Sequence, residues 1–119
     1  MILIVEDDKN ARHLFARILS KVGYQVVEAA DSEEALALLQ ARAGFELVMT
    51  DLVMPGVDGV NLAKQIRLRW PETKILLMSG YQRADAVHFL LNENTDFLDK
   101  PIDLTSMISK VTRLVPRRH

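Results

Sequence analysis

Cysteine is absent from this chain, which excludes disulfides, thiolate metal sites and cysteine nucleophiles together. Long hydrophobic stretches are missing too, since no apolar run approaches the roughly eighteen residues that a membrane helix needs. The opening residues, Met1 to Val5, lack a basic flank and run straight into acids, unlike a signal peptide. We therefore expect a cytoplasmic protein that does not enter a membrane.

A surplus of charge of either sign is also missing. The 16 acidic and 15 basic side chains give a formal net charge of -1, which leaves no overall cationic field to hold nucleic acid. The short basic end at residues 117–119 is interpreted as a solvated tail. We expect no direct binding of nucleic acid by this chain.

The residues that are present fit one compact domain. The chain has 119 residues, of which 49% are hydrophobic and 26% charged. This balance is typical of a globular protein, because disordered chains are poorer in apolar residues and more one-sidedly charged. A chain of this length is too short for two independent cores, so we predict a single domain over residues 1–119.

Short apolar runs alternate with amphipathic segments along the chain. The first run, Ile2–Val5, predicts a strand buried on both faces. Apolar side chains then recur at helical spacing from Ala11 to Val22, and Gly23 follows where a helix would stop. Later strands are expected at Gln25–Glu28, Phe45–Thr50, Lys74–Met78 and Thr95–Leu98. Later helices are expected from Asp31 to Gly44, from the Asp58-Gly59 turn to Trp70, at about residues 83–91, and from Asp103 to Pro116.

This alternation predicts a three-layer α/β fold with five parallel strands and five helices. Each helix must carry the chain back before the next parallel strand begins, so helices cover both faces of the sheet. In open sheets of this kind the ligand site lies beyond the carboxyl ends of the strands, where the strand order reverses. The strand ends are therefore the places where chemistry is expected.

Polar residues follow four of the five predicted strands. They are Glu6-Asp7-Asp8 after the first strand, Asp51 after the third, Ser79-Gly80 after the fourth and Lys100-Pro101 after the fifth. If the first and third strands are neighbours, Asp7 and Asp51 converge. Clustered carboxylates stay ionised only with a cation among them, and oxygen ligands with room for water suit Mg²⁺. With a lysine charge and a serine hydroxyl nearby, the set matches phosphoryl transfer.

Most of these residues also have a simpler structural interpretation. Asp7 or Asp8 can cap the first helix. Ser79 can belong to a plain turn, and Lys100 can be a surface lysine. Asp51 is different, because the segment at 52–55 that follows it is a poor helix start and gives it no cap to form. Their joint placement at adjacent strand ends favours a functional site.

The strand-end segments resemble those of a known family, the receiver domain of bacterial response regulators. The matching segments, which occur in the family's order, are Ile2–Asp8, Asp51–Gly59, Met78–Gly80 and Asp99–Pro101. The resemblance spans essentially the whole chain and implies a flavodoxin-like (βα)5 fold with strand order 2-1-3-4-5. It also implies a signalling switch of a two-component system rather than a dedicated enzyme.

The resemblance assigns a role to each acid at these strand ends. Asp51 would be the phosphoacceptor, taking a phosphoryl group from the phosphohistidine of a sensor histidine kinase or a histidine phosphotransfer protein. Asp7 would bind Mg²⁺ directly and Glu6 would bind it through water. Asp51 and the backbone carbonyl of Val53 would complete the protein's metal ligands.

The resemblance also implies how phosphorylation is read out. Ser79 would bind one phosphoryl oxygen and Lys100 another, with a cis peptide between Lys100 and Pro101. Movement of the Ser79 hydroxyl would be coupled to Phe97 on the fifth strand, where many members have tyrosine. The switching face would comprise the fourth helix, the fifth strand and the last helix, and this face also allows a homodimer.

Three alternative hypotheses use the same chemistry or architecture. A flavodoxin-like cofactor binder would need a glycine- or hydroxyl-rich phosphate loop after the first strand, where this chain has three acids. An aspartate-nucleophile phosphatase would need an acid at position 53, which is Val53. A degenerate receiver would bind partners without phosphorylation, although the acid, hydroxyl and lysine set is complete here.

The kind of protein to which the domain belongs stays open. It can be a stand-alone regulator, the receiver of a longer regulator or the receiver of a hybrid kinase.

Overall fold

The computed structural model describes residues 1–54, 57–80 and 94–117. The strands are β1 (Ile2–Val5), β2 (Val26–Ala29), β3 (Leu47–Asp51), β4 (Val53–Met54), β5 (Val57–Asp58), β6 (Lys74–Ser79) and β7 (Thr95–Asp99). The helices are α1 (Lys9–Val22), α2 (Ser32–Ala41), α3 (Gly59–Arg69) and α4 (Leu104–Leu114). The helix expected at about residues 83–91 lies outside the described residues, as does the Pro55-Gly56 turn.

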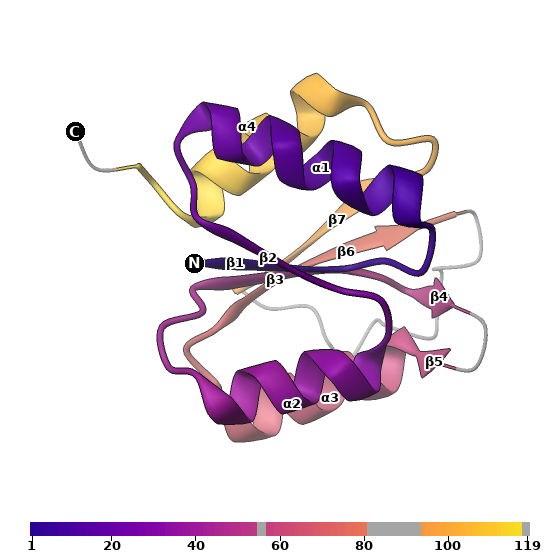
Figure 1. Ribbon diagram of the computed structural model, residues 1–119, viewed down its shortest axis with the longest axis vertical. Helices are drawn as coiled ribbons and strands as arrows, with labels where there is room; N and C mark the ends of the chain where they lie inside the picture. Colours follow the sequence, from indigo (N-terminus) through magenta and orange to yellow (C-terminus); the bar gives the residue numbers. More distant parts are fainter. Residues whose placement is uncertain (55–56, 81–93, 118–119) are drawn as a thin grey trace.

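Five strands form one parallel sheet in the order β2-β1-β3-β6-β7. This confirms the predicted order 2-1-3-4-5 and the three-layer α/β class. In Figure 1 the sheet is seen nearly edge-on, with α1 and α4 on one side and α2 and α3 on the other. The short antiparallel ribbon of β4 and β5 was not predicted, and it directly follows the carboxyl end of β3.

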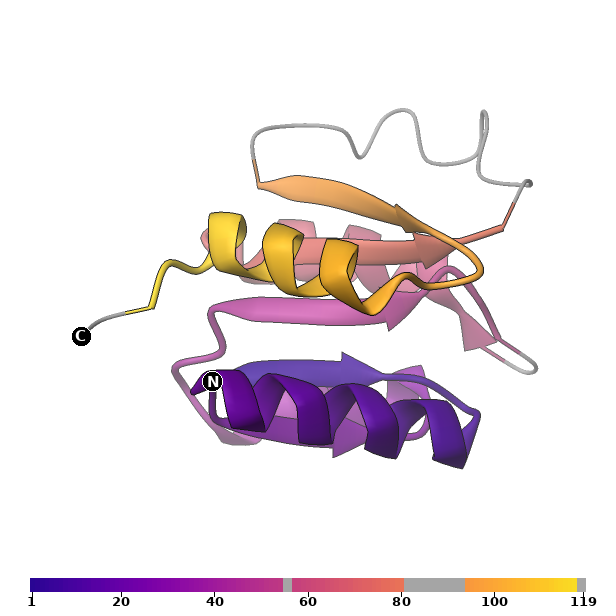
Figure 2. The ribbon, with the colours of Figure 1, turned by 90° about the horizontal axis from the view of Figure 1, so that it is seen from above.

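Each face of the sheet carries its own hydrophobic core, because successive side chains of a strand point to opposite sides. On β1, Leu3 and Val5 belong to the core covered by α2 and α3, whereas Ile2 and Ile4 belong to the core covered by α1 and α4. The four β1 side chains are at most 1% exposed. Figure 2 shows α1 and α4 lying side by side over one face. No helix within the described ranges is long and apolar enough to cross a membrane.

Aspartates begin three of the helices. Asp8, Asp31 and Asp103 each stand at an N-cap and accept a hydrogen bond from a backbone N–H two or three residues on. The capping hypothesis is therefore confirmed for Asp8, which leaves Asp7 without that role. Gly23 ends α1 in the left-handed region, with φ 120°, as the sequence predicted.

Several predicted boundaries differ from the structure. β3 begins at Leu47 rather than Phe45, and β3, β6 and β7 each end one residue later than expected, at Asp51, Ser79 and Asp99. β2 runs from Val26 to Ala29, one residue later than expected, because its register pairs Val26 with Ile2 and Ala29 with Val5. The predicted helix end at Gly44 was wrong, since α2 stops at Ala41 and the extended residue that follows donates its N–H to the Leu38 carbonyl.

Gly59 allows the first turn of α3 to approach the end of β3. A Cβ at this position would lie 2.3 Å from the Asp51 carbonyl oxygen and 2.5 Å from that of Leu52. Both distances are far below van der Waals contact, and both atoms belong to the backbone. The glycine therefore keeps α3 against the segment that carries Asp51.

Gly59→Ala is expected to destabilise the protein by roughly 3 kcal/mol, because the Asp51–Leu52 backbone must move to admit the methyl group. Urea denaturation of the variant measures this change. Gly80→Ala is the matched control, since among the described residues no atom lies within 4 Å of a Cβ there. Equal stability losses in the two variants would contradict the close approach.

Candidate functional site

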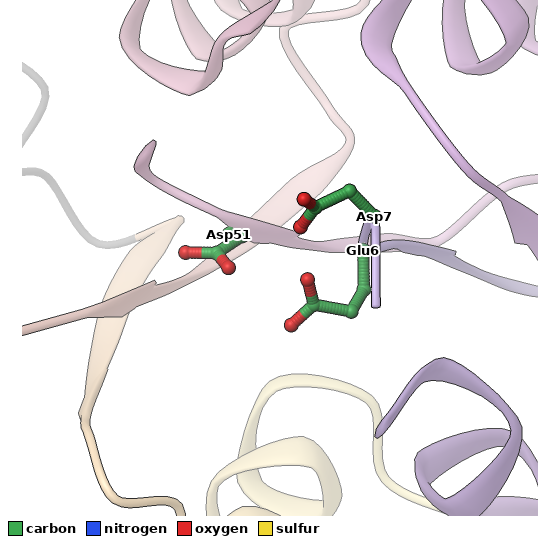
Figure 3. Close-up of side chains that lie close together, drawn as sticks. All are labelled: Glu6, Asp7 and Asp51. Carbon is green, nitrogen blue, oxygen red and sulfur yellow. The ribbon is translucent and has the colours of Figure 1, made fainter. Parts of the chain in front are cut away.

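Three carboxylates meet at the carboxyl edge of the sheet. Glu6 and Asp7 follow β1, Asp51 ends β3, and one ligand oxygen from each lies within 4.8 Å of the others. Figure 3 shows the Glu6 and Asp7 side chains turned toward Asp51. Glu6 and Asp51 are 5% and 3% exposed, whereas Asp7 is exposed to solvent. The predicted convergence of Asp7 and Asp51 is thus confirmed, because β1 and β3 are neighbours in the sheet.

Lys100 lies against the buried end of this acid cluster. It follows β7, and its Nζ is 2.6 Å from Asp51 Oδ2. Its backbone N–H donates to the Ser79 carbonyl at 2.8 Å, which ties the ends of β6 and β7 together. The peptide between Lys100 and Pro101 is cis, as predicted. The chain thus supplies one cation, in direct contact, to a buried carboxylate.

Ser79 is buried at the end of β6, the strand beside β3. Its hydroxyl oxygen has no hydrogen-bond partner among the described residues. A buried hydroxyl without a partner loses the hydrogen bonds that water would provide, so such groups are rare and often mark a ligand site. The role of Ser79 as a donor to a phosphoryl group at Asp51 stays a prediction.

The environment of Glu6 favours its protonated form. Burial of the side chain, a hydrogen bond with the Asp7 carboxyl group and the negative charge of Asp51 raise the pKa of Glu6 from 4.5 to about 7. The Asp8 N–H, which donates to Glu6 Oε2 at 3.2 Å, and the Lys100 charge act in the opposite direction. Burial and the two neighbouring acids therefore outweigh the Asp8 N–H and the Lys100 charge.

The donor set fits a small divalent cation such as Mg²⁺. The three side chains offer hard carboxylate oxygens close enough to share one ion, and the exposed Asp7 leaves one side open to water. Burial and the neighbouring acids raise the pKa of Glu6, and a bound cation would favour its ionised form. Val53 directly follows this site, in β4, and its carbonyl stays a predicted ligand.

Phe97 lies two strands away from the acid-bearing end of β3. It is half-buried on β7 and packs against the core covered by α2 and α3. Lys110 of α4 donates a hydrogen bond to its carbonyl oxygen. The position is that of a core aromatic at a sheet edge, and its role as a switch stays a prediction.

Sequence reasoning missed one residue that contacts the site. Arg12 of α1 donates from Nη1 to the Glu6 carbonyl at 2.8 Å and from Nε to Glu28 Oε1 at 3.2 Å. Its spacing within α1 gave no signal, because charged residues on an amphipathic helix normally face solvent. The contact arises only when β2 places Glu28 beside the carboxyl end of β1.

Comparisons with known proteins agree with this geometry. The profile of the response regulator receiver domain family matches residues 2–112. Response regulator protein FleR of Pseudomonas aeruginosa is 38% identical over 113 residues, which cover 94% of this chain and 24% of FleR. Response regulator receiver protein CpdR of Brucella abortus is 30% identical over 120 residues, which cover 96% of this chain and 95% of CpdR.

A solved structure supports the same assignment. The receiver domain of NtrX from Brucella abortus is 30% identical, with a TM-score of 0.86, and the match covers 99% of this chain and 100% of that one. The chain spans about a quarter of the length of FleR but nearly all of CpdR. A family match over almost all residues, the parallel sheet order and the acid cluster lead to one conclusion: the chain belongs to the response regulator receiver domains of two-component systems.

Proposed function

We propose that Asp51 accepts a phosphoryl group from the phosphohistidine of a sensor histidine kinase or a histidine phosphotransfer protein. The observation that carries this proposal is the 2.6 Å contact between Lys100 Nζ and Asp51 Oδ2 at the edge of the acid cluster. Asp51 is buried, yet its carboxylate lies between a cation and two further acids. Lys100 would stabilise negative charge on the Asp51 nucleophile and on its phosphorylated product.

In the transfer step, an Asp51 oxygen attacks the phosphorus of the phosphohistidine. The new O–P bond forms as the P–N bond breaks, and the imidazole nitrogen leaves with the electron pair and takes up a proton. Lys100 then pairs with a phosphoryl oxygen instead of the carboxylate. The Ser79 hydroxyl donates to another phosphoryl oxygen, which gives that buried group its missing partner.

Mg²⁺ is the cofactor of this proposal. Receiver domains normally bind it at their acidic residues, and this chain has the Glu6, Asp7 and Asp51 cluster. Asp7 and Asp51 would bind it directly, Glu6 through water, and the Val53 carbonyl would complete the protein ligands. The bound ion neutralises charge on the carboxylates and the transferred phosphoryl group.

The proposed output is a shift in the predicted switching face, of which the structure describes β7 and α4. Asp96 of β7 pairs with Lys110 and Arg113 of α4. Burial alone would raise the pKa of Asp96, but the Phe97 N–H and these two cations outweigh it and lower the pKa below its usual value. Engagement of Ser79 by the phosphoryl group would bias Phe97 and this ion-pair cluster toward a second arrangement. The same face is where a homodimer would form.

Acetyl phosphate and MgCl2 are expected to add a single phosphoryl group to the protein, measured by intact mass. Asp51→Ala and the nearly isosteric Asp51→Asn should give no adduct, because the nucleophile is missing. A chelator should prevent the adduct on the wild type. A folded wild type that stays unmodified, beside a control receiver that is modified, would favour a phosphorylation-independent interaction module.

Stability without Mg²⁺ is expected to fall as the pH rises from about 4.5 to about 7. In this window the folded state holds a proton on Glu6 that the unfolded chain has released. Full deprotonation of Glu6 therefore lowers the free energy of unfolding by on the order of 3 kcal/mol. Thermal unfolding across this range measures the loss. Glu6→Gln should flatten the profile, whereas the exposed Glu33→Gln should not.

Added MgCl2 is expected to raise Tm more at pH 8 than at pH 5, because the ion binds the deprotonated carboxylates. An equal rise at both pH values would contradict a site made of these acids.

Ser79→Ala is expected to leave the unphosphorylated protein equally stable or more stable. The substitution removes a buried hydroxyl that has no partner among the described residues. The phosphorylated form should lose its phosphoryl group faster or form more slowly, since one donor to the phosphoryl oxygens is gone. Chemical denaturation and time-resolved intact mass measure the two effects. A destabilised variant with unchanged phosphorylation kinetics would contradict the role of Ser79.

A further inference from the structure

We infer that Arg12, held by Glu28, is a positioning residue that aims the Glu6-Asp7 acid pair toward Asp51. This inference rests on the proposed function, because it concerns how the same metal-binding acids are kept in place. Among the described residues, the Arg12 guanidinium contacts the Glu6 carbonyl and the Glu28 carboxylate, not the carboxylates of Glu6, Asp7 or Asp51. It acts through the backbone of Glu6.

The Glu6 residue is held from two sides through its backbone. Its N–H donates to the Ala29 carbonyl of β2 at 3.1 Å. Its carbonyl accepts from Arg12 Nη1 at 2.8 Å. That carbonyl belongs to the peptide joining Glu6 to Asp7, so the orientation of this peptide sets where the Asp7 side chain points. Asp7 is the exposed member of the cluster, and its direction depends most on the backbone.

Arg12 is itself fixed by an ion pair. Its Nε lies 3.2 Å from Glu28 Oε1, and the two side chains are only 13% and 31% exposed. His13 Nδ1 lies 2.7 Å from the same Glu28 oxygen, although the His13 side chain is half exposed. A guanidinium holds two acceptors at once because its donors form a planar fork, and lysine cannot reproduce this arrangement.

The charge of Arg12 argues against a simpler role as counter-ion to the acids. Glu28 neutralises the guanidinium, and the donor nearest the site contacts a carbonyl oxygen rather than a carboxylate. Among the charged groups that shift the pKa of Glu6, Lys100 contributes the lowering effect. Arg12 therefore contributes geometry to the acid pair, in the way that outer hydrogen bonds orient the ligands of other metal sites.

Removing Arg12 should weaken Mg²⁺ binding about tenfold, the lower end of what loss of an orienting contact costs. Isothermal titration of the full chain with MgCl2 at pH 8 measures the affinity of wild type, Arg12→Ala, Arg12→Lys and Glu28→Ala. Arg12→Lys should fall between wild type and Arg12→Ala. Arg12→Ala with Glu28→Ala should be no worse than Arg12→Ala alone, since the two residues act as one unit. Arg17→Ala, an exposed arginine of the same helix, should bind as the wild type does.

Phosphorylation kinetics distinguish the loss of a positioning role of Arg12 from misfolding of the variant. With acetyl phosphate, Arg12→Ala should react slowly at limiting MgCl2 and recover the wild-type rate at saturating MgCl2. If Arg12→Ala is misfolded, it would stay slow at both concentrations. The Mg²⁺ affinities of Arg12→Lys and Glu28→Ala then test the positioning role. If Arg12→Lys, Glu28→Ala and Arg12→Ala all bind Mg²⁺ as tightly as the wild type, the positioning role of Arg12 is overturned but the proposed function is not. A wild type that binds no Mg²⁺ overturns the proposed function as well.

Discussion

The gathering of three carboxylates within 4.8 Å of one another is the constraint on which the rest of the structure depends. The parallel order of the sheet creates the constraint by placing the ends of β1 and β3 side by side. Lys100, which directly follows the edge strand β7, offsets part of the charge through Asp51. Burial of the Glu6 side chain, its hydrogen bond with Asp7 and the charge of Asp51 together raise the pKa of Glu6 to about 7, and a cation bound among these acids would favour its ionised form.

The scaffold holds this unfavourable arrangement with apolar packing on both sides of the sheet. Strands β1, β3 and β6 are almost wholly buried, and their alternating side chains fill two separate cores. Contacts near the strand ends then fix the local backbone. Gly59 lets α3 approach the Asp51 carbonyl, and Arg12 holds the Glu6 carbonyl from α1. Apolar packing in the two cores thus stabilises the fold enough to hold the acids together at one edge of the sheet.

Much of the fold and the site could be predicted from the sequence, for definite reasons. Apolar runs such as Ile2–Val5 and the period of α1 are local signals, and a parallel sheet brings Asp7 and Asp51 to one edge. The position of Lys100 followed from the same rule. The Arg12 to Glu28 contact, the β4–β5 ribbon and the close approach of Gly59 were not predicted, because each depends on how separate elements pack. The end of α2 was misplaced because its last hydrogen bond precedes the glycine that suggested it.

The measurement that tests the central claim most directly is the location of the phosphoryl group among these crowded acids. Borohydride reduces an aspartyl phosphate to homoserine, and peptide mapping by mass spectrometry then identifies the altered position. Homoserine at position 51 of the phosphorylated protein is the result this account predicts. Homoserine at position 7 or 8, or no reduced residue in a protein that carries the phosphoryl mass, would contradict it.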